Sequence, residues 1–220
     1  MTLIEPIRQN PQHTKKYSSP LRLWHWGNAL VICGSLITVL INSTLSDRIN
    51  ITKVVQNELN HGGITVSAKQ AGSISHTLSG QVWKIHAYFG YALAGLLLLR
   101  LVMEFFQQAD QKLIRKIKAA YYHYKATKAN RKLYQHELTV KTIYAVFYLL
   151  LIIMAITGLF LAFEDLLAPY KAIRHTVKEI HGFCMYFIIA FIVIHLIGVY
   201  LAERRGSAGI VSDMINGGKA

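Results

Sequence analysis

Four long apolar runs, separated by polar connectors, dominate the pattern of the chain. They cover about residues 21–41, 82–106, 138–163 and 177–202. Each reaches the roughly 20 residues that a helix needs to cross about 30 Å of hydrocarbon. The pattern therefore predicts an all-α integral membrane protein, folded as a four-helix bundle in a single domain over residues 1–220.

The first run resembles a retained helix rather than a targeting signal. About 20 mostly polar residues precede it, and no Ala-x-Ala-like cleavage motif follows it. A secretory signal peptide would carry such a site directly after its apolar core. We therefore expect the first run to stay in the membrane.

Composition and charge agree with this interpretation and add an orientation. The chain of 220 residues is 53% hydrophobic and 16% charged, with a net charge of +13. With the N-terminus inside, 17 of the 24 Lys and Arg residues fall on the cytoplasmic side and 7 on the other. The positive-inside rule then predicts that both termini are cytoplasmic. We assign the basic segment between the second and third runs to topology and anionic lipid, not to nucleic acid.

The two cysteines give no sign of a cysteine-based site. Cys33 and Cys184 both lie inside apolar runs, where a free cysteine ordinarily packs as a small apolar side chain. The chain has no C-x-x-C-H stretch for covalent haem attachment and no cysteine cluster for zinc or iron–sulfur.

Four histidines inside the apolar runs carry the functional prediction: His25, His86, His181 and His195. A neutral imidazole in hydrocarbon needs polar partners. Given the predicted direction of each run, His25 and His195 lie at the cytoplasmic level, and His86 and His181 lie at the outer level. The 14 residues from His181 to His195 rise about 21 Å and stop about 40° short of four full turns, so one helix can face two stacked sites.

Two imidazoles from different helices at one depth fit the axial positions of a haem iron, and a six-coordinate iron of this kind favours electron transfer. We predict two stacked haem b groups, held by the pairs His25/His195 and His86/His181. Zinc fits less well, because it needs three or four clustered ligands. For any single histidine the alternative is a hydrogen bond between helices. Six histidines are expected in flanks or loops: His13, His61, His76, His123, His136 and His175.

Haem propionates need cationic partners. Arg22 and Arg100 are the candidates at the cytoplasmic level, and Arg100 shares a helical face with His86, 14 residues earlier. Snorkelling to lipid phosphate is the alternative for Arg100. The outer candidates are Lys84, Arg174 and Lys178. Glycines in or beside the runs would let a macrocycle or a neighbouring helix approach the backbone: Gly34, Gly90, Gly95, Gly158, Gly182 and Gly198.

Two stretches of sequence resemble a known family. They are "SSPLRLWHWGNAL" at residues 18–30 and "EIHGFCMYFIIAFIVIHLIGVYLAERRG", which is followed by "GIVSDMINGGK". Both are similar to the bacterial cytochrome b561 family, specifically to the b-type cytochrome subunits of membrane-bound nickel-iron hydrogenases. Formate dehydrogenase gamma subunits share the plan more distantly.

The resemblance implies that His25, His86, His181 and His195 are the axial ligands of two haem b groups in a bacterial inner membrane. It also implies electron transfer from a periplasmic donor, such as hydrogenase or dehydrogenase subunits, to membrane quinone. The segment 42–81, with "HGGITVSAKQAGSISH", matches no motif that we can name. A docking surface and a long connector would both suit it.

Three functions stay open at this point. The first is an electron-transfer and anchoring subunit that links a periplasmic dehydrogenase, with a hydrogenase as the best candidate, to the quinone pool. The second is a stand-alone enzyme such as a superoxide:quinone oxidoreductase, for which Lys84, Lys171, Arg174 and Lys178 would supply a cationic funnel. The third is a helical anchor without redox chemistry. Catalytic acid–base groups cannot be assigned, although Glu104, Glu203 and His136 are available proton carriers.

Overall fold

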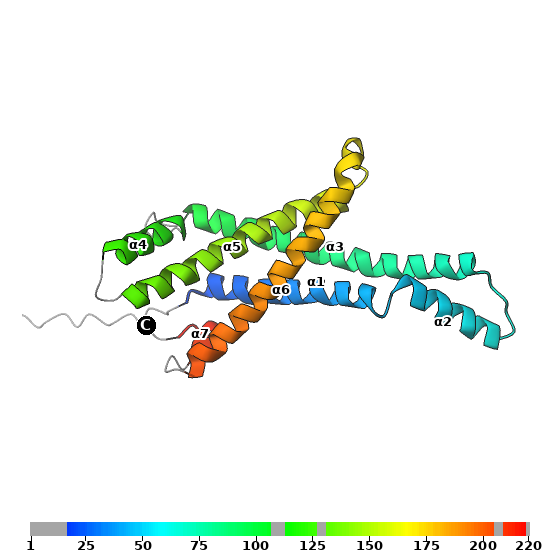
Figure 1. Cartoon of the computed structure of the whole chain (residues 1–220), viewed down its shortest axis with the longest axis horizontal. Coiled ribbons are helices and arrows are strands. Elements are labelled where there is room, and N and C mark those ends of the chain that lie inside the picture. The colour runs from blue at the N-terminus through cyan, green and yellow to red at the C-terminus, as the bar shows by residue number, and fades with distance from the viewer. Residues whose placement is uncertain (1–16, 107–112, 127–130, 205–208, 219–220) are drawn as a thin grey trace, which may run out of the picture. The chain divides into compact units, whose positions relative to one another are not determined.

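The computed structural model describes residues 17–106, 113–126, 131–204 and 209–218. All regular elements in these ranges are helices (Figure 1). They are α1 (Ser19–Ser43), α2 (Arg48–His61), α3 (Ala68–Phe106), α4 (Leu113–Ala126), α5 (Arg131–Ala162), the 3-10 helix η2 (Ala168–Ile173), α6 (Arg174–Arg204) and α7 (Ile210–Asn216).

Four of these helices, α1, α3, α5 and α6, are long and apolar enough to cross a membrane. This confirms the predicted all-α class with four spanning segments. Two spans begin earlier than the apolar runs indicated: α3 begins at Ala68 rather than near 82, and α5 begins at Arg131 rather than near 138. The 39 residues of α3 measure roughly 58 Å, so much of this helix exceeds a hydrocarbon layer of about 30 Å.

The segment 42–81, for which the sequence is compatible with a docking surface or a long connector, is largely helical. Asp47 caps α2, because its carboxylate accepts the backbone N–H groups of Ile49 and Asn50 at 3.2 Å each. At the other end of α2, Gly63 takes a φ of +78°, which a residue with a Cβ rarely adopts. The chain can therefore turn directly from α2 toward α3.

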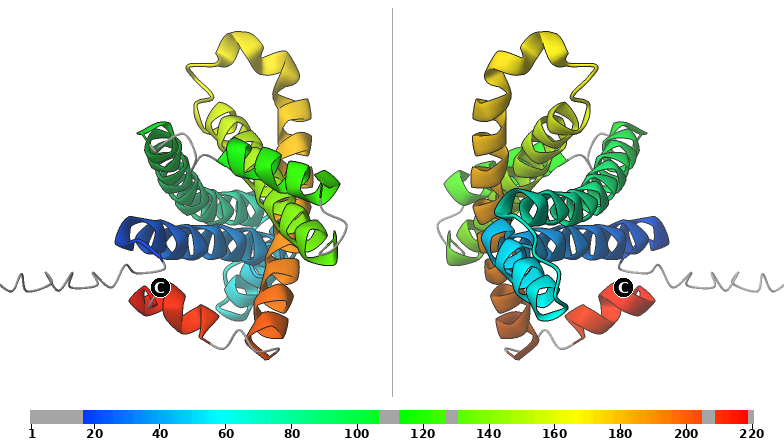
Figure 2. Two further views of the ribbon diagram at one scale, coloured as in Figure 1. Left: turned by 90° about the vertical axis from the view of Figure 1, so that its left-hand side faces the viewer. Right: turned by 90° about the vertical axis from the view of Figure 1, so that its right-hand side faces the viewer.

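The start of α3 is fixed by a capping box. The hydroxyl of Ser67 accepts the backbone N–H of Gln70 at 3.3 Å, and the Gln70 side chain accepts the backbone N–H of Ser67 at 2.9 Å. Small buried residues then let α2 pack against the first turns of α3, as Figures 1 and 2 show. Ser75 is fully buried there and donates to the carbonyl of Arg48 at 3.2 Å.

The chain divides into two compact units, one formed by Met1–Trp26 with Ile192–Ala220 and the other by Gly27–Phe191. In the larger unit, α5 packs against both α3 and α4. In the smaller unit, the backbone N–H of Tyr17 donates to the carbonyl of Gly217 at 3.1 Å. The predicted single domain over residues 1–220 stays a prediction.

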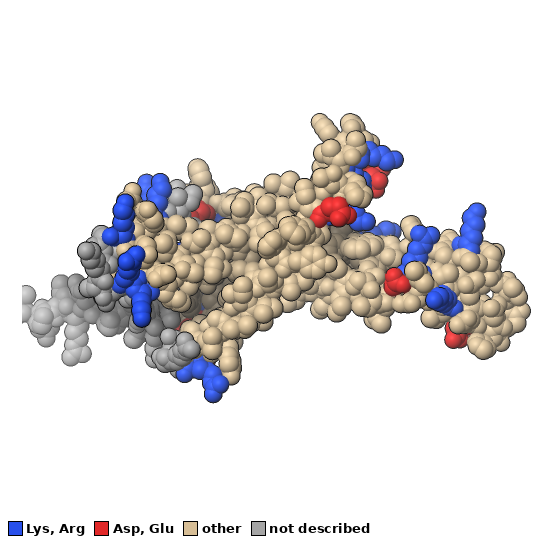
Figure 3. All heavy atoms as spheres, viewed as in Figure 1, with Lys and Arg blue, Asp and Glu red and all other residues tan. Residues whose placement is uncertain are grey.

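The helix middles of the larger unit expose apolar side chains. Leu98, Leu149 and Phe187 are examples, each about half exposed or more. On the face that Figure 3 shows, Lys and Arg of this unit gather over α4, over α2 with the start of α3, and around η2. Apolar surface between charged ends is what a helix in contact with lipid requires.

Candidate functional site

His86 on α3 and His181 on α6 lie face to face within the larger unit. Their ring centroids are 6.3 Å apart, and the ring planes are nearly perpendicular at 84°. Both side chains are half-buried. These residues are 95 positions apart in sequence, so the fold, and not their neighbourhood in the chain, brings them together.

His25 on α1 and His195 on α6 form a second pair within the smaller unit. Their ring centroids are 6.2 Å apart and their planes are inclined by 56°. The indole of Trp26 packs edge-on against His25, with centroids 5.2 Å apart. The structure thus brings together the same two pairs that matching by depth predicts.

The separation within each pair suits one metal ion between the two rings. Two imidazoles that bind an ion from opposite sides have ring centres about 6 Å apart, because each metal–nitrogen bond is about 2 Å and the ring centre lies about 1 Å behind the nitrogen. Direct hydrogen bonding between the rings would need a nitrogen–nitrogen distance near 3 Å and hence closer centres. The pairs at 6.2 and 6.3 Å therefore fit the axial ligation of a haem iron.

Hydroxyl groups on neighbouring helices hold the His86/His181 pair. The Nδ1 atom of His181 lies 2.9 Å from the hydroxyl of Thr157 on α5. The Nδ1 atom of His86 lies 2.9 Å from the hydroxyl of Thr38 and 3.3 Å from that of Ser35, both on α1. This would leave the Nε2 atom of each ring available to a metal ion. These hydroxyls were not predicted from the sequence, where their only signal is a polar residue inside an apolar run.

The second pair has different surroundings. The Nδ1 atom of His25 is buried and has no hydrogen-bond partner among the described residues. A buried imidazole nitrogen without a partner costs free energy, so it marks a place where a bound group can satisfy the ring. The two pairs thus share a spacing but differ in how their rings are supported.

Glycines give the histidines room. A Cβ on Gly158 would lie 3.2 Å from Cε1 of His181, which is closer than ordinary packing. Gly90 and Gly198 lie one helical turn beyond His86 and His195, on the same faces, and a Cβ at either position would meet nothing within 4 Å. Open space beside each pair is compatible with a flat macrocycle.

Arg22 lies three residues before His25 and ties α1 to α7. One terminal nitrogen donates to the backbone carbonyl of Ile215, and the other donates to the hydroxyl of Ser19 at 3.1 Å. Its Nε atom is buried and has no partner among the described residues. Trp26 adds a second tie, because its indole N–H donates to the carbonyl of Met214 at 3.1 Å. The R-x-W-H-W segment at residues 22–26 is thereby a packing site for α7 as well as the source of His25.

Arg100 is already engaged by the protein. Its guanidinium forms an ion pair with Glu104, one turn later on α3, at 2.9 Å, and its Nε donates to the hydroxyl of Tyr148 at 3.3 Å. The Glu104 carboxylate thus already balances the positive charge of Arg100 that a haem propionate would otherwise pair with. Glu203, a candidate proton carrier, accepts the backbone N–H groups of Gly209 and Val211 at 2.7 and 3.4 Å and so caps the start of α7.

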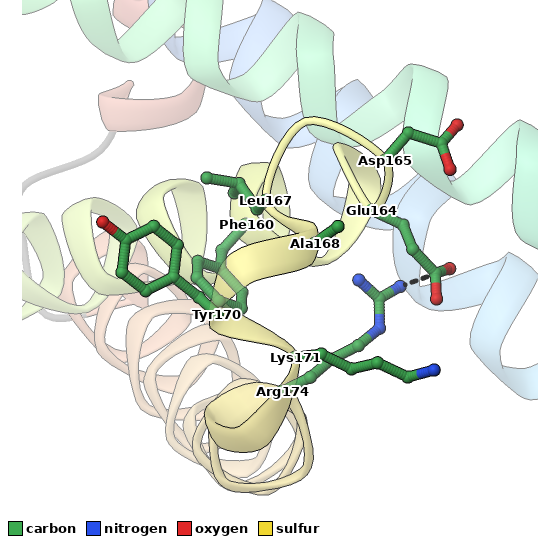
Figure 4. Close-up of a pocket in the computed structure, with 8 residues that line it drawn as sticks. All are labelled: Phe160, Glu164, Asp165, Leu167, Ala168, Tyr170, Lys171 and Arg174. Carbon is green, nitrogen blue, oxygen red and sulfur yellow. Dashed lines mark hydrogen bonds and ion pairs between the residues drawn. The ribbon is translucent and has the colours of Figure 1, made fainter.

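A cavity of about 220 Å³ lies at the junction of α5 and η2, lined by Phe160, Glu164, Asp165, Leu167, Ala168, Tyr170, Lys171 and Arg174 (Figure 4). Arg174 closes one side of it. Its guanidinium donates to Glu164 and to the backbone carbonyl of Leu161, both at 2.9 Å. This arginine therefore secures the end of α5 and is partly neutralised.

The remaining histidines do not join either pair. His61, His76, His136 and His175 are exposed, but they lie on helices, so the expectation that they lie in flanks or loops was wrong. His13 and the side chain of His123 lie outside the described residues. Within the described ranges, no three His, Cys, Asp or Glu side chains come together as a cluster that could hold a metal ion.

Comparison with known proteins gives one match. The family model described as "Prokaryotic cytochrome b561" matches residues 16–217. Neither the curated proteins nor the solved structures contain a match to the chain. The matched range includes all four spanning helices and both histidine pairs, and a family of this kind binds b-type haem. The chain therefore belongs to the prokaryotic cytochrome b561 family, whose members are transmembrane b-type cytochromes of electron transfer.

Proposed function

We propose that this protein is a dihaem cytochrome b that carries electrons between a periplasmic redox partner and the membrane quinone pool. The two imidazole pairs, with centroids 6.2 and 6.3 Å apart, are the observation that carries the proposal. Under this proposal, His25 and His195 would hold one haem b, and His86 and His181 would hold the other. Haem supplies reversible one-electron chemistry when bound.

The protein's own residues position the group and exclude water. The histidines of both pairs lie on helices apolar enough to span a membrane, so lipid and apolar side chains would shield a bound macrocycle from water. Arg22 is the better propionate candidate, because its buried Nε is an open donor three residues from His25. Arg100 keeps its role as a propionate candidate only if it shares its charge with Glu104.

The best candidate for the partner is a hydrogenase-type dehydrogenase. The hairpin formed by α2 and the first half of α3 offers such a partner a docking surface. This hairpin extends beyond the length of a spanning helix. It also exposes apolar side chains such as Ile49, Val54 and Leu78. With both termini cytoplasmic, the hairpin would face the periplasm of a bacterial inner membrane, on the side of the proposed donor.

The alternative is a stand-alone superoxide:quinone oxidoreductase. Superoxide would lose one electron to become O₂, and two such electrons with two protons would reduce a quinone to a quinol. This function needs a cationic funnel that attracts superoxide. Arg174 is a poor contributor to it, because its guanidinium is bound to Glu164. We therefore favour the subunit function.

Haem content tests the proposal. We expect two haems b per chain by pyridine-haemochrome quantification of the purified protein. The variants His25→Ala, His195→Ala, His86→Ala and His181→Ala should each retain about one. His175→Ala is the matched control, because this exposed histidine lies on α6 six residues before His181, and it should retain two.

Folded protein without haem would overturn the proposal, and so would four variants that all keep two haems. Quinone reduction by superoxide with the purified chain alone would favour the stand-alone enzyme. Dependence of quinone reduction on an added dehydrogenase complex would favour the subunit.

A further inference from the structure

The hydroxyl groups beside His86 and His181 determine which nitrogen of each ring carries the proton. The Thr157 hydroxyl lies 2.6 Å from the backbone carbonyl of Ile153, one turn earlier on α5, and donates its single proton to it. The hydroxyl of Thr38 likewise donates to the carbonyl of Ser35. A hydroxyl has one proton to donate and two lone pairs.

Because these protons are committed to carbonyls, the threonine oxygens can only accept from the rings that lie 2.9 Å away. Each imidazole must then carry its proton on Nδ1 and present an unprotonated Nε2. That is the tautomer in which Nε2 can bind a metal ion. His86 and His181 are therefore held in a ligating form before any metal arrives.

A hydrogen bond from the far nitrogen of a ligating histidine also changes the ligand. It fixes the orientation of the ring and raises its basicity, which makes Nε2 a stronger donor. A stronger donor stabilises ferric iron more than ferrous iron and so lowers the reduction potential. Axial ligands and their hydrogen bonds are among the means by which a protein tunes haem iron.

We propose that Thr38 and Thr157 are positioning residues that hold His86 and His181 in the Nδ1–H form and lower the reduction potential of the haem bound between them. This inference rests on the proposed dihaem function. In the other pair, the Nδ1 atom of His25 has no acceptor among the described residues, so that ring lacks the same support. Because both rings of the His86/His181 pair have this support and His25 does not, we expect the haem between His86 and His181 to have the lower potential of the two.

Substitution by valine tests the inference, because valine keeps the shape of threonine and removes the acceptor. Spectroelectrochemical titration of the wild type should resolve two potentials. In Thr38→Val and Thr157→Val the lower potential should rise, by about 59 mV for each tenfold weakening of ferric relative to ferrous binding. The higher potential should not move.

Thr142→Val is the matched control. Thr142 also lies on α5 and donates to a carbonyl one turn earlier, that of Leu138 at 2.8 Å, but it is exposed and contacts neither pair. This variant should leave both potentials unchanged. Thr38→Ser and Thr157→Ser keep the hydroxyl and should restore the lower potential to near its wild-type value.

The outcomes separate the inference from the proposed function. Both haems present with unchanged potentials in the two valine variants would overturn the inference and leave the dihaem function standing. A rise confined to the higher potential, or the same rise in the serine variants, would also overturn it. Wild-type protein that binds no haem would overturn the proposed function itself. Haem loss in the valine variants, with haem retained in the serine variants and the control, would support the positioning role.

Discussion

Thr157 and Gly158 show how two adjacent residues can serve one histidine in different ways. The hydroxyl of Thr157 lies 2.9 Å from the Nδ1 atom of His181, and the missing side chain of Gly158 leaves room for the ring's Cε1 atom. One residue orients the imidazole and the other lets it approach α5. A substitution at either should therefore disturb the ring without touching a bound group.

Gly158→Ala tests the second of these roles. The added Cβ would lie 3.2 Å from Cε1 of His181, so the ring or α5 must shift by a few tenths of an ångström. We expect haem to leave the variant up to about tenfold faster than the wild type, in line with the loss of supporting contacts around a metal ligand. The rate is measurable as transfer of haem to excess apomyoglobin.

Gly80→Ala supplies the control, because a Cβ at that position of α3 would meet nothing within 4 Å. Both substitutions replace a helical glycine with a better helix former, so helix propensity affects them alike. Equal haem-transfer rates in the two variants would contradict the role assigned to Gly158.

At this scale the sequence predicted the pairs of histidines but not their supports. Pairing needs only helix direction and depth, which hydropathy and the positive-inside rule supply. The contact between Thr38 and His86 depends on the rotation of α1 about its own axis relative to α3, which no pattern within one helix encodes. The close approach of His181 to Gly158 likewise depends on how two helices are rotated against each other. Six glycines were candidates for such an approach, and the sequence could not rank them.

Among the elements, α7 is held by side chains from both α1 and α6. It has seven residues, too few to be stable as an isolated helix. Side chains from the start of α1 hold its last turn through the carbonyls of Met214 and Ile215. Glu203 caps its first turn. The helix therefore depends on partners elsewhere in the smaller unit.

Trp26→Phe should loosen α7. Phenylalanine keeps the apolar ring but cannot donate to the carbonyl of Met214, and a hydrogen bond of this type contributes about 1 kcal/mol. We expect amide hydrogen exchange in Ile210–Asn216 to become about fivefold faster. Mass spectrometry of the peptides that cover this helix measures the change.

Trp83→Phe is the corresponding control. Trp83 packs edge-on against His86, with centroids 5.3 Å apart, and lies in the larger unit, so its substitution should leave exchange in α7 unchanged. If Trp26→Phe exchanged as slowly as the wild type in this helix, the indole hydrogen bond would not be what holds α7.

The elements that the sequence analysis missed were those that apolar runs do not mark. Hydropathy identified the four spans, because each contains a long uncharged stretch. It could not find α2, whose composition is polar, nor the first turns of α3. The local signals were present: Asp47 before α2, the glycines after it, and Ser67 with Gln70 at the start of α3. Such signals locate the two ends of a helix, but they do not by themselves show that the residues between them are helical.

For the whole molecule, two features determine how the protein lies in the membrane. They are the exposed apolar surface of the helix middles and the asymmetric distribution of charge. Apolar side chains such as Leu98 and Leu149 are stable at the surface only if lipid covers them. The excess of Lys and Arg around α4 then becomes the main determinant of orientation. Orientation would in turn decide which histidine pair faces the proposed periplasmic electron donor.

Cysteine labelling tests that orientation. In a background with Cys33→Ala and Cys184→Ala, we would place single cysteines by Asn57→Cys on α2 and Ala119→Cys on α4, both exposed positions. A membrane-impermeant maleimide should label the α2 variant in intact spheroplasts and the α4 variant only after permeabilisation. The reverse pattern would put α2 and the start of α3 in the cytoplasm, against the positive-inside rule. A periplasmic donor could then not dock on this hairpin, and the direction of electron transfer that we propose would be lost even if both haems were present.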